Sequence, residues 1–433
     1  MPPGRVYCPG KSPTCGVTAG PGHGHHLEVG MISQIEETYS VNIRNMKRSV
    51  IRELLKLTAQ PDIISFAGGL PSPESFPVEE LKQVMIEMMD TEPYPVLQYG
   101  TTEGDIELRR HLVEKHYVPH ENMPITTDNL VITTSSQQAL DLIGKIFIDP
   151  GDEIVCGAPT YLGGINAFAA YGARFRTVEL DDEGMRADLL ERQLDTIKKE
   201  GRRAKFLYCV PDFQNPTGIT MSERRRRAVV ELAEAHNLLI IEDSPYRELR
   251  FEGVNPPTIY SIAKPGNVAL LGTLSKILCP SFRIGWVVAC EELVDKIVVA
   301  KQSADLCTSA FTQRIAARYM QKGHLNPRIL KTVDLYREKR DTMVNAFEQF
   351  MPPGVTWVKP QGGLFLFLRT PESIDCTKMF PKAIAEKVAY VIGSAFYPDG
   401  SGHNTMRLNF SFMNKEQIVE GVQRLARVIK SEL

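Results

Sequence analysis

The feature that most constrains the fold is an alternation of short apolar runs with helix-patterned segments between about residues 100 and 290. Short apolar runs are typical of buried strands, whereas apolar residues at every third or fourth position are typical of amphipathic helices. The strand-like runs are NLVITT (129–134), DEIVCGA (152–158), RFRTVEL (174–180), FLYCV (206–210) and LLIIED (238–243), and a helix-patterned segment follows each of the first four. We therefore predict an α/β fold in which helices cover a mostly parallel sheet.

The C-terminal third has a different pattern. A long amphipathic segment around 325–350 precedes the strand-like stretches TWVKP, GGLFLFLRT and TMRLNFSF. This order predicts a smaller α+β domain over residues 321–433, next to a large domain over residues 96–320. We expect residues 31–95 to form an N-terminal arm and helix and to contribute to the small domain.

The first thirty residues differ from the rest because they are rich in Gly and Pro. They carry residue types that ligate zinc, namely Cys8, Cys15, His23, His25 and His26. Their spacing fits no compact tetrahedral pattern, so we predict a disordered extension over residues 1–30 without a metal site. Beyond it, residues 44–58 (RNMKRSVIRELLKLT) have helical spacing that stops before Pro61.

The composition argues against several classes of protein. A formal net charge of -2 over 433 residues provides no polycation for nucleic acid. No uninterrupted apolar run reaches the ~18 residues that a membrane span needs. The eight cysteines lack a secreted framework, and several lie inside apolar runs. We expect a cytoplasmic protein that binds neither nucleic acid nor a membrane.

Polar residues at the ends of four strand-like runs define the candidate site. In an open parallel sheet, ligands bind beyond the carboxyl ends of the strands. After NLVITT, the helix start Ser135-Ser-Gln-Gln138 offers hydroxyls and backbone N–H groups to an anion such as phosphate. The other three ends carry Asn215, Asp243 with Tyr246, and Thr273-Leu-Ser275-Lys276 followed by Arg283. We predict that these groups converge on one crevice that binds a phosphorylated aromatic aldehyde.

Each feature alone has a simpler interpretation. A serine at a helix start is usually an N-cap, Asn-Pro is usually a turn, and Lys276 alone reads as a solvated turn lysine. Their joint occurrence in this order favours a single site.

The ordered set resembles the fold type I pyridoxal-phosphate enzymes, within the class I/II aminotransferases. The resemblance rests on Ser136-Gln137, Tyr161, Asn215-Pro-Thr-Gly218, Asp243-x-x-Tyr246, Ser275-Lys276, Arg283 and Arg407. The stretches SVIRELLKLTAQPDIISFAGGLPSPESFP, LQYGTTEG, EDSPYRELRF and HNTMRLNFS are most similar to 2-aminoadipate and kynurenine/aminoadipate aminotransferases. The resemblance covers roughly residues 44 to 433, and the complete ordered set is specific.

The resemblance implies roles toward pyridoxal 5'-phosphate. Lys276 forms the internal aldimine and, once freed, is the base that moves the substrate's α-proton. Asp243 keeps the pyridine nitrogen protonated, Asn215 and Tyr246 meet the phenolic oxygen, and Tyr161 stacks on the ring. The phosphate is bound by Ser136, Gln137, Thr273, Ser275 and Arg283, and by Tyr99 of the neighbouring subunit in a homodimer with a shared active site.

On the substrate side, the resemblance implies that Arg407 binds the α-carboxylate and Arg52 a distal carboxylate, and that Gly69 and Asn215 also bind the substrate. The implied function is an aminotransferase (EC 2.6.1.-) that passes the amino group of 2-aminoadipate, glutamate, or an aromatic or branched-chain amino acid to 2-oxoglutarate or a similar 2-oxo acid. Two alternatives stay open. One is a lyase or decarboxylase with the same cofactor. The other is a non-enzymatic effector-binding domain of a transcription regulator, although we expect the short N-terminal arm to leave no room for a DNA-binding module.

Overall fold

The structure is a computed structural model, and it describes residues 35–46 and 62–433. The chain divides into two compact units, Met1–Val41 and Asn42–Leu433. The described part of the first unit contains the 3-10 helix η1 (Ile35–Thr38). The short helix α1 (Val41–Asn45) begins at Val41, which is the last residue of the first unit. The extension predicted for residues 1–30, most of the helix predicted for residues 44–58, and Arg52 lie outside the described residues.

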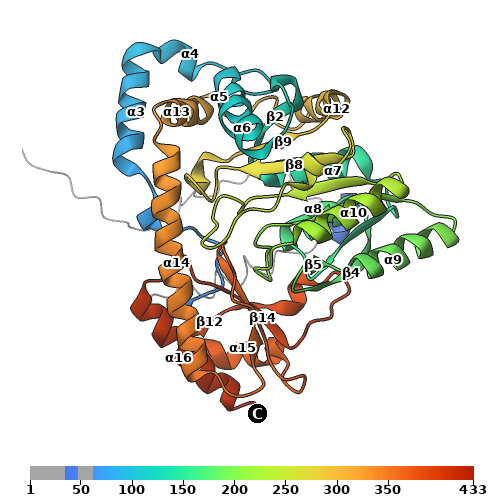
Figure 1. Cartoon of the computed structure of the whole chain (residues 1–433), viewed down its shortest axis with the longest axis vertical. Coiled ribbons are helices and arrows are strands. Elements are labelled where there is room, and N and C mark those ends of the chain that lie inside the picture. Colours follow the sequence, from blue (N-terminus) through green and yellow to red (C-terminus); the bar gives the residue numbers. More distant parts are fainter. Residues whose placement is uncertain (1–34, 47–61) are drawn as a thin grey trace, which may run out of the picture. The chain divides into compact units, whose positions relative to one another are not determined.

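The second unit is built on an eight-stranded sheet with the order β2-β9-β8-β7-β6-β3-β4-β5 (Figure 1). Its strands are β2 (Leu130–Thr134), β3 (Glu153–Ala158), β4 (Arg174–Asp181), β5 (Gly184–Met185), β6 (Ala204–Cys209), β7 (Leu239–Asp243), β8 (Val268–Thr273) and β9 (Ile284–Val288). Strands β8, β7, β6, β3 and β4 run parallel. Strand β9 lies antiparallel between β2 and β8, and β5 is antiparallel at the edge. The predicted mostly parallel sheet is therefore confirmed, and β5 and β9 are additions to it.

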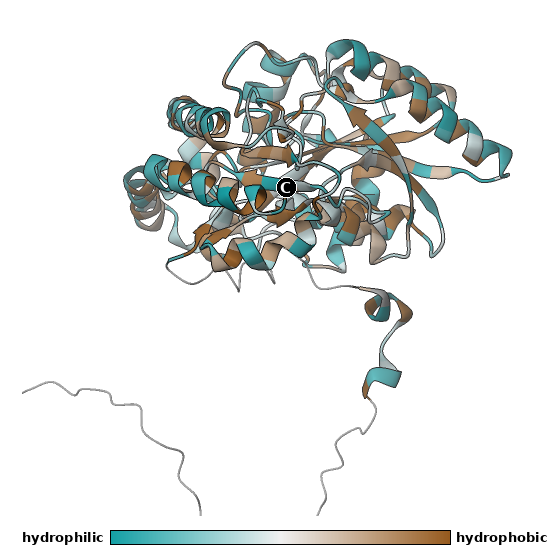
Figure 2. Ribbon diagram, turned by 90° about the horizontal axis from the view of Figure 1, so that it is seen from below, coloured by the Kyte–Doolittle hydropathy of each residue, from teal (hydrophilic) through white to brown (hydrophobic). Residues whose placement is uncertain are grey.

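Helices cover both faces of this sheet because its strands are apolar on both sides. In β6, Leu207 packs into the core beside helices α9 (Ala187–Lys199) and α10 (Glu223–Ala235). The next residue, Tyr208, points to the opposite core, which contains residues of α7 (Ser135–Phe147), α8 (Leu162–Ala169) and α12 (Glu291–Gln302). This alternation follows from the two-residue period of a strand. Figure 2 shows apolar residues along the strands and polar residues on the outer surfaces of helices.

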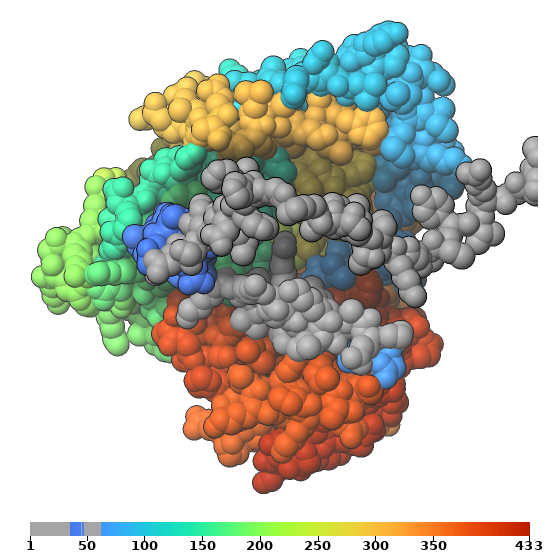
Figure 3. Space-filling view, turned by 180° about the vertical axis from the view of Figure 1, so that it is seen from behind, coloured from blue at the N-terminus to red at the C-terminus, as the bar shows by residue number. Residues whose placement is uncertain are grey.

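A smaller antiparallel sheet, with the order β10-β11-β14-β13, is formed by the C-terminal part of the chain. Its strands are β10 (Thr356–Trp357), β11 (Phe365–Arg369), β13 (Val391–Ile392) and β14 (Thr405–Asn409). Helices α14 (Leu325–Phe350), α15 (Cys376–Ala385) and α16 (Lys415–Lys430) accompany it. In Figure 3, the part of this segment after α14, coloured orange-red to red, gathers in one lobe, and Figure 1 shows the long helix α14 leading into it. The second, α+β part of the predicted fold is thus present, whereas the exact domain boundaries stay a prediction.

An N-terminal segment joins this lobe, because β1 (Ile64–Ser65) pairs in parallel with β12 (Val388–Ala389). The remaining helices are α3 (Val78–Thr91), α4 (Pro93–Leu97), α5 (Ile106–Leu112), α6 (Val118–Glu121), α11 (Ile259–Ile262), α13 (Ala310–Gln321), the 3-10 helices η2 (Pro73–Ser75), η4 (Thr127–Asn129), η5 (Pro280–Phe282) and η6 (Gly393–Phe396), and the π-helix η3 (Val113–Tyr117). Within the described ranges, every helix is too short or too polar to cross a lipid bilayer.

Candidate active site

A cavity of about 330 Å³ lies at the carboxyl ends of β2, β6, β7 and β8. The predicted residues that line it are Gly69, Ser136, Gln137, Tyr161, Asn215, Asp243, Tyr246, Thr273, Ser275, Lys276, Arg283 and Arg407. Two hollows of about 830 and 900 Å³ elsewhere are larger and more open, so the chemistry of the lining, rather than its size, identifies the site. Tyr99 does not line the cavity, and its side chain is 82% exposed. Its predicted contact with a neighbouring subunit stays a prediction.

Lys276 follows strand β8 and points its amine at the loop that contains the paired glycines. Its Nζ donates to the carbonyl oxygen of Gly69 at 2.8 Å. Burial, together with the positive charges of Arg407 and Arg283, lowers the pKa of Lys276 to about 8. A larger fraction of neutral amine is therefore present near neutral pH than in an ordinary lysine. In this loop, the group that contacts the amine is the backbone carbonyl of Gly69.

Asp243 is the last residue of β7 and is the only carboxylate among the described residues that line the cavity. Its Oδ2 accepts a hydrogen bond from the hydroxyl of Tyr208 at 2.8 Å, whereas its Oδ1 is buried without a partner in the described structure. Burial raises the pKa of Asp243 to about 7, and the Tyr208 hydrogen bond opposes that rise. The carboxyl is thus available to a cationic or N–H group in the cavity.

Tyr208 is a site residue that the sequence analysis missed. It lies in the middle of the apolar run FLYCV, where an aromatic residue reads as core. A Cβ atom added to Gly164 would lie 2.9 to 3.1 Å from the phenol of Tyr208. The absence of a side chain at position 164 therefore makes room for the phenol that reaches Asp243.

Arg407 of β14 is held between polar and aromatic groups. Its Nη1 donates to Asn215 Oδ1 at 3.0 Å and its Nη2 to the Ala67 carbonyl at 2.9 Å. The guanidinium lies over the rings of Phe365 and Phe396, at 4.2 and 5.1 Å from their centroids. Its Nε is buried without a partner in the described part of the chain. Burial lowers the pKa of Arg407 to about 10, which still leaves the group charged at neutral pH.

Asn215 and Tyr246 lie side by side at the same end of the cavity. The Asn215 amide donates to the Tyr246 hydroxyl at 3.4 Å, and the Tyr246 ring packs edge-on against Phe365. Tyr161, at the start of α8, also lines the cavity, and burial raises its pKa. Burial raises the pKa of Tyr246 as well, so both phenols are neutral at physiological pH.

The start of helix α7 forms the anion-binding end of the site. The N-cap residue Thr134 makes no capping hydrogen bond with its side chain. No capping side chain therefore competes with an anion for the N–H groups of the first turn. Ser135 adopts a left-handed backbone conformation with φ 64°, its N–H donates to the Arg283 carbonyl at 2.8 Å, and its hydroxyl accepts from the Arg283 guanidinium. A Cβ atom at Gly285 would overlap the backbone of Ser135 and Ser136, so glycine permits β9 to pass this close.

Hydroxyls from the lysine loop complete this end. The Ser275 N–H donates to Thr273 Oγ1 at 3.1 Å, and the Thr273 hydroxyl lies 2.8 Å from the Ile284 carbonyl, to which it donates. Gln137 is exposed, and its amide donates to the Gly163 carbonyl at 3.2 Å.

A buried ion-pair network lies beside the loops that carry Asn215 and Tyr246. Asp212 accepts from Arg226 at 2.6 Å and from Arg247 at 3.1 Å, and Arg247 also donates to both oxygens of Glu121 at 2.6 Å. Burial opposes ionisation of Asp212, but the two arginines hold its pKa below the usual range. The network fixes the two loops relative to each other. The sequence analysis did not predict this network; the charged residues beside the motifs, in PDFQNPTG and DSPYRE, are the signal that could have indicated it.

The lining fits pyridoxal 5'-phosphate. The uncapped helix start, the hydroxyls and Arg283 suit a phosphate. The amine of Lys276 suits an aldehyde, and the unpartnered Oδ1 of Asp243 suits a protonated ring nitrogen. The unpartnered Nε of Arg407 leaves a donor for a substrate carboxylate.

Comparison with known proteins agrees with this chemistry. Residues 61–425 match the family "Aminotransferase class I and II". The chain is 48% identical over 398 residues to aromatic-amino-acid aminotransferase 1 of Thermococcus litoralis, covering 92% of this chain and 95% of that protein. It is 38% identical over 401 residues to 2-aminoadipate transaminase of Thermus thermophilus, covering 92% of this chain and 98% of that protein.

Among solved structures, the chain is similar to the kynurenine aminotransferase of Pyrococcus horikoshii, crystallised with PMP, kynurenine and its product. The TM-score is 0.90 at 44% sequence identity, over 93% of this chain and all of the other.

Proposed function

Because the chain belongs to the class I and II aminotransferases, which use pyridoxal phosphate, we propose that it transfers the α-amino group of aromatic and acidic amino acids to 2-oxoglutarate or a similar 2-oxo acid. The observation that carries this proposal is the single cavity that combines the low-pKa amine of Lys276, the carboxyl of Asp243 and the guanidinium of Arg407.

When bound, the cofactor supplies an electron sink for charge at the substrate's α-carbon and carries the amino group between half-reactions. Asp243 would hold the ring nitrogen protonated, Tyr161 would pack against the ring, and Asn215 and Tyr246 would donate to its phenolic oxygen. The proposed phosphate ligands are Ser136, Gln137, Thr273, Ser275 and Arg283.

Lys276 is the proposed base for the proton of the substrate's α-carbon. A base works best when its pKa lies near the working pH, and the lowered pKa of Lys276 meets this condition. Arg407 would bind the α-carboxylate with the planar pair of donors that a lysine lacks. Its aromatic neighbours Phe365 and Phe396 limit its conformational freedom, which supports a fixed role.

The substrate side chain is the part of the proposal that depends on Arg52. Among the described residues, the cations that line the cavity are Lys276, Arg283 and Arg407, and each already has a proposed partner. A distal carboxylate therefore needs a further cation. The similarity to a 2-aminoadipate transaminase supports Arg52 for this role, and the similarity to an aromatic-amino-acid aminotransferase supports aromatic donors.

We also propose a homodimer with a shared active site. Tyr99 is 82% exposed, and the nearby Tyr94 and Leu97 are 85% and 66% exposed, so a strongly apolar stretch is accessible before α5. A second copy that covers this stretch would bring Tyr99 to the neighbouring phosphate site. The cytoplasmic location inferred from cysteine usage is part of the same proposal.

A panel of amino donors against 2-oxoglutarate tests the function. We expect glutamate to appear in a one-to-one ratio with the oxo acid of each accepted donor, and borohydride reduction to fix the cofactor on Lys276. The Lys276→Ala variant should retain cofactor without a covalent bond and lose the transfer. Release of ammonia or carbon dioxide instead of glutamate would favour a lyase or a decarboxylase, and a label on another lysine would overturn the site.

A further inference from the structure

A second cavity of about 540 Å³ lies next to the lysine loop and outside the active site. Its wall is formed by the segment from α5 to α6, the turn after β7, strand β8, the end of α13 and the start of α14. Pro245 and Thr273 line both this cavity and the active-site cavity. Its volume is within the range of roughly 300 to 1,000 Å³ that is typical of small-molecule sites.

The inner wall of the second cavity is apolar and preformed. Trp286, Leu274 and Met320 line it, and each is at most 5% exposed. The indole of Trp286 is fixed because its Nε1 donates to the Tyr117 hydroxyl at 2.6 Å. A Cβ atom at Gly272 would overlap this indole, so the ring lies directly on the backbone of β8. Such a wall favours the apolar part of a ligand without rearrangement.

The opening of the second cavity carries one ammonium group and three imidazoles, and burial lowers the pKa of the His111 imidazole. His111, Lys115, His116 and His120 line it from one segment of ten residues. The one carboxylate among its described lining residues is Glu248, which lies 3.5 Å from His116 Nε2. No ion pair joins Lys115 to any residue in the described part of the chain. The opening therefore has an ammonium group available for an anion.

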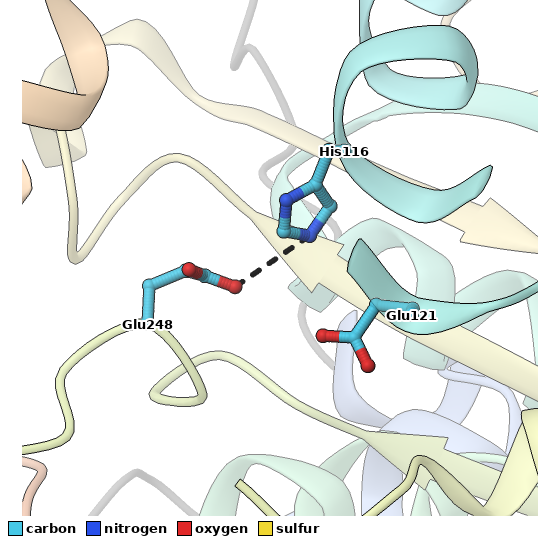
Figure 4. A group of neighbouring side chains, drawn as sticks. All are labelled: His116, Glu121 and Glu248. Carbon is cyan, nitrogen blue, oxygen red and sulfur yellow. Dashed lines mark ion pairs between the residues drawn. The ribbon is translucent and has the colours of Figure 1, made fainter. Parts of the chain in front are cut away.

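Glu121 lies beside this opening and forms, with His116 and Glu248, a group with potential metal ligands (Figure 4). However, Arg247 donates to both carboxylate oxygens of Glu121 at 2.6 Å. A guanidinium in this bidentate position neutralises the carboxylate and already uses both of its oxygens. We assign this group to the ion-pair network that fixes the turn after β7.

We propose that the second cavity is a binding site for a small aryl or branched-alkyl monocarboxylate, with the carboxylate at Lys115 and the apolar body against Trp286. The apolar wall excludes a strongly polar ligand, and the Lys115 ammonium at the opening favours an anion over a neutral or cationic molecule of the same shape. This inference does not depend on the substrates of the active site.

The test is calorimetric titration of the holoenzyme with 3-phenylpropionate, with the amide of the same acid as an uncharged probe. Arg407→Ala removes the proposed carboxylate ligand of the active site, so binding that persists in this variant reports the second cavity. Lys115→Glu should weaken that binding about tenfold or more, and the amide should bind more weakly to a similar extent. Lys331→Glu makes the same charge change on an exposed residue of α14 that does not line the cavity, and it should leave the affinity unchanged.

Location is tested with the two tryptophans of the chain. A Trp357→Phe variant keeps Trp286 alone, so its fluorescence should change with the same dissociation constant that calorimetry gives. Loss of all binding in Arg407→Ala, equal binding of acid and amide, or unchanged affinity in Lys115→Glu would each overturn the proposal.

Discussion

The hydrogen bond from Tyr208 to Asp243 provides a direct test of the proposed role of Asp243. Tyr208→Phe removes one oxygen atom and retains the ring, which packs edge-on against Phe168 with centroids 5.4 Å apart. Because Oδ1 of Asp243 has no partner among the described residues, Tyr208 is the one donor to this carboxylate in that part of the chain. The substitution therefore leaves Asp243 buried and without a protein donor.

The size of the effect follows from the charge on the acceptor. A hydrogen bond to a charged group stabilises it by roughly 1.5 to 3 kcal/mol, or about 1 to 2 pKa units. Burial already raises the pKa of Asp243 to about 7, and the Tyr208 hydrogen bond acts in the opposite direction. In Tyr208→Phe the pKa of Asp243 should therefore rise by roughly 1 to 2 units. If the ionised carboxylate is needed, the rate at pH 7 should fall roughly 5- to 50-fold, because the wild-type carboxyl is itself only about half ionised there, and recover as the pH increases.

The assay is the pH profile of kcat/KM, whose acid limb should move upward by about 1 to 2 pH units in the variant. Tyr171→Phe is a matched control, because the Tyr171 hydroxyl donates to Asp141 at 3.2 Å outside the cavity. Retention of cofactor during dialysis below pH 8 gives a measurement that does not depend on turnover, and it should weaken only in Tyr208→Phe. A loss of equal size at every pH would assign Tyr208 to packing alone and refute this reasoning.

Three further variants test other parts of the site. Arg52→Ala should reduce kcat/KM roughly ten- to hundredfold for 2-aminoadipate and much less for an aromatic donor, whereas Arg407→Ala should reduce kcat/KM for every donor. Equal losses of kcat/KM with both donor classes in Arg52→Ala would exclude a distal-carboxylate contact. In cofactor-free protein, the rate of acylation of Lys276 should have a pH midpoint near 8, well below the ordinary 10.5, and Arg407→Ala should raise this midpoint because a like charge is removed. A midpoint above 10 in the wild-type protein would contradict the burial argument. Gly164→Ala should displace the phenol of Tyr208 and reproduce part of the Tyr208→Phe pH shift, so a wild-type profile would disprove the close contact.

The cluster of Asn215, Asp243 and Lys276 was predictable because it depends on chain order and direction alone. Each residue ends, or closely follows, a strand-like run, and parallel strands bring their carboxyl ends to the same edge. Strands β6, β7 and β8 are neighbours in the sheet, and the residues meet there. No knowledge of side-chain packing was needed for this step.

Contacts that depend on register and on the second sheet were beyond sequence reasoning. Tyr208 reaches Asp243 because β6 and β7 pair with Tyr208 opposite Ile241, and an apolar strand pattern does not specify that register. The two aromatic rings on Arg407 come from positions distant in sequence, in β11 and η6. Phe365 and Phe396 read as ordinary core residues in the sequence, since nothing local indicates which cation they face.

The charge balance of the cavity connects these contacts with catalysis. Three cations, Lys276, Arg283 and Arg407, face one carboxylate in the described lining, and this excess of positive charge contributes to the lowered pKa of Lys276. A phosphate at Arg283 and an α-carboxylate at Arg407 would neutralise both repulsive charges. The pKa of the Lys276 amine should then increase as these anions bind. The amine would be neutral and nucleophilic before the cofactor binds, and more basic once the substrate has released it to accept the α-proton, so the same two arginines that bind the anions would also adjust the base to each step.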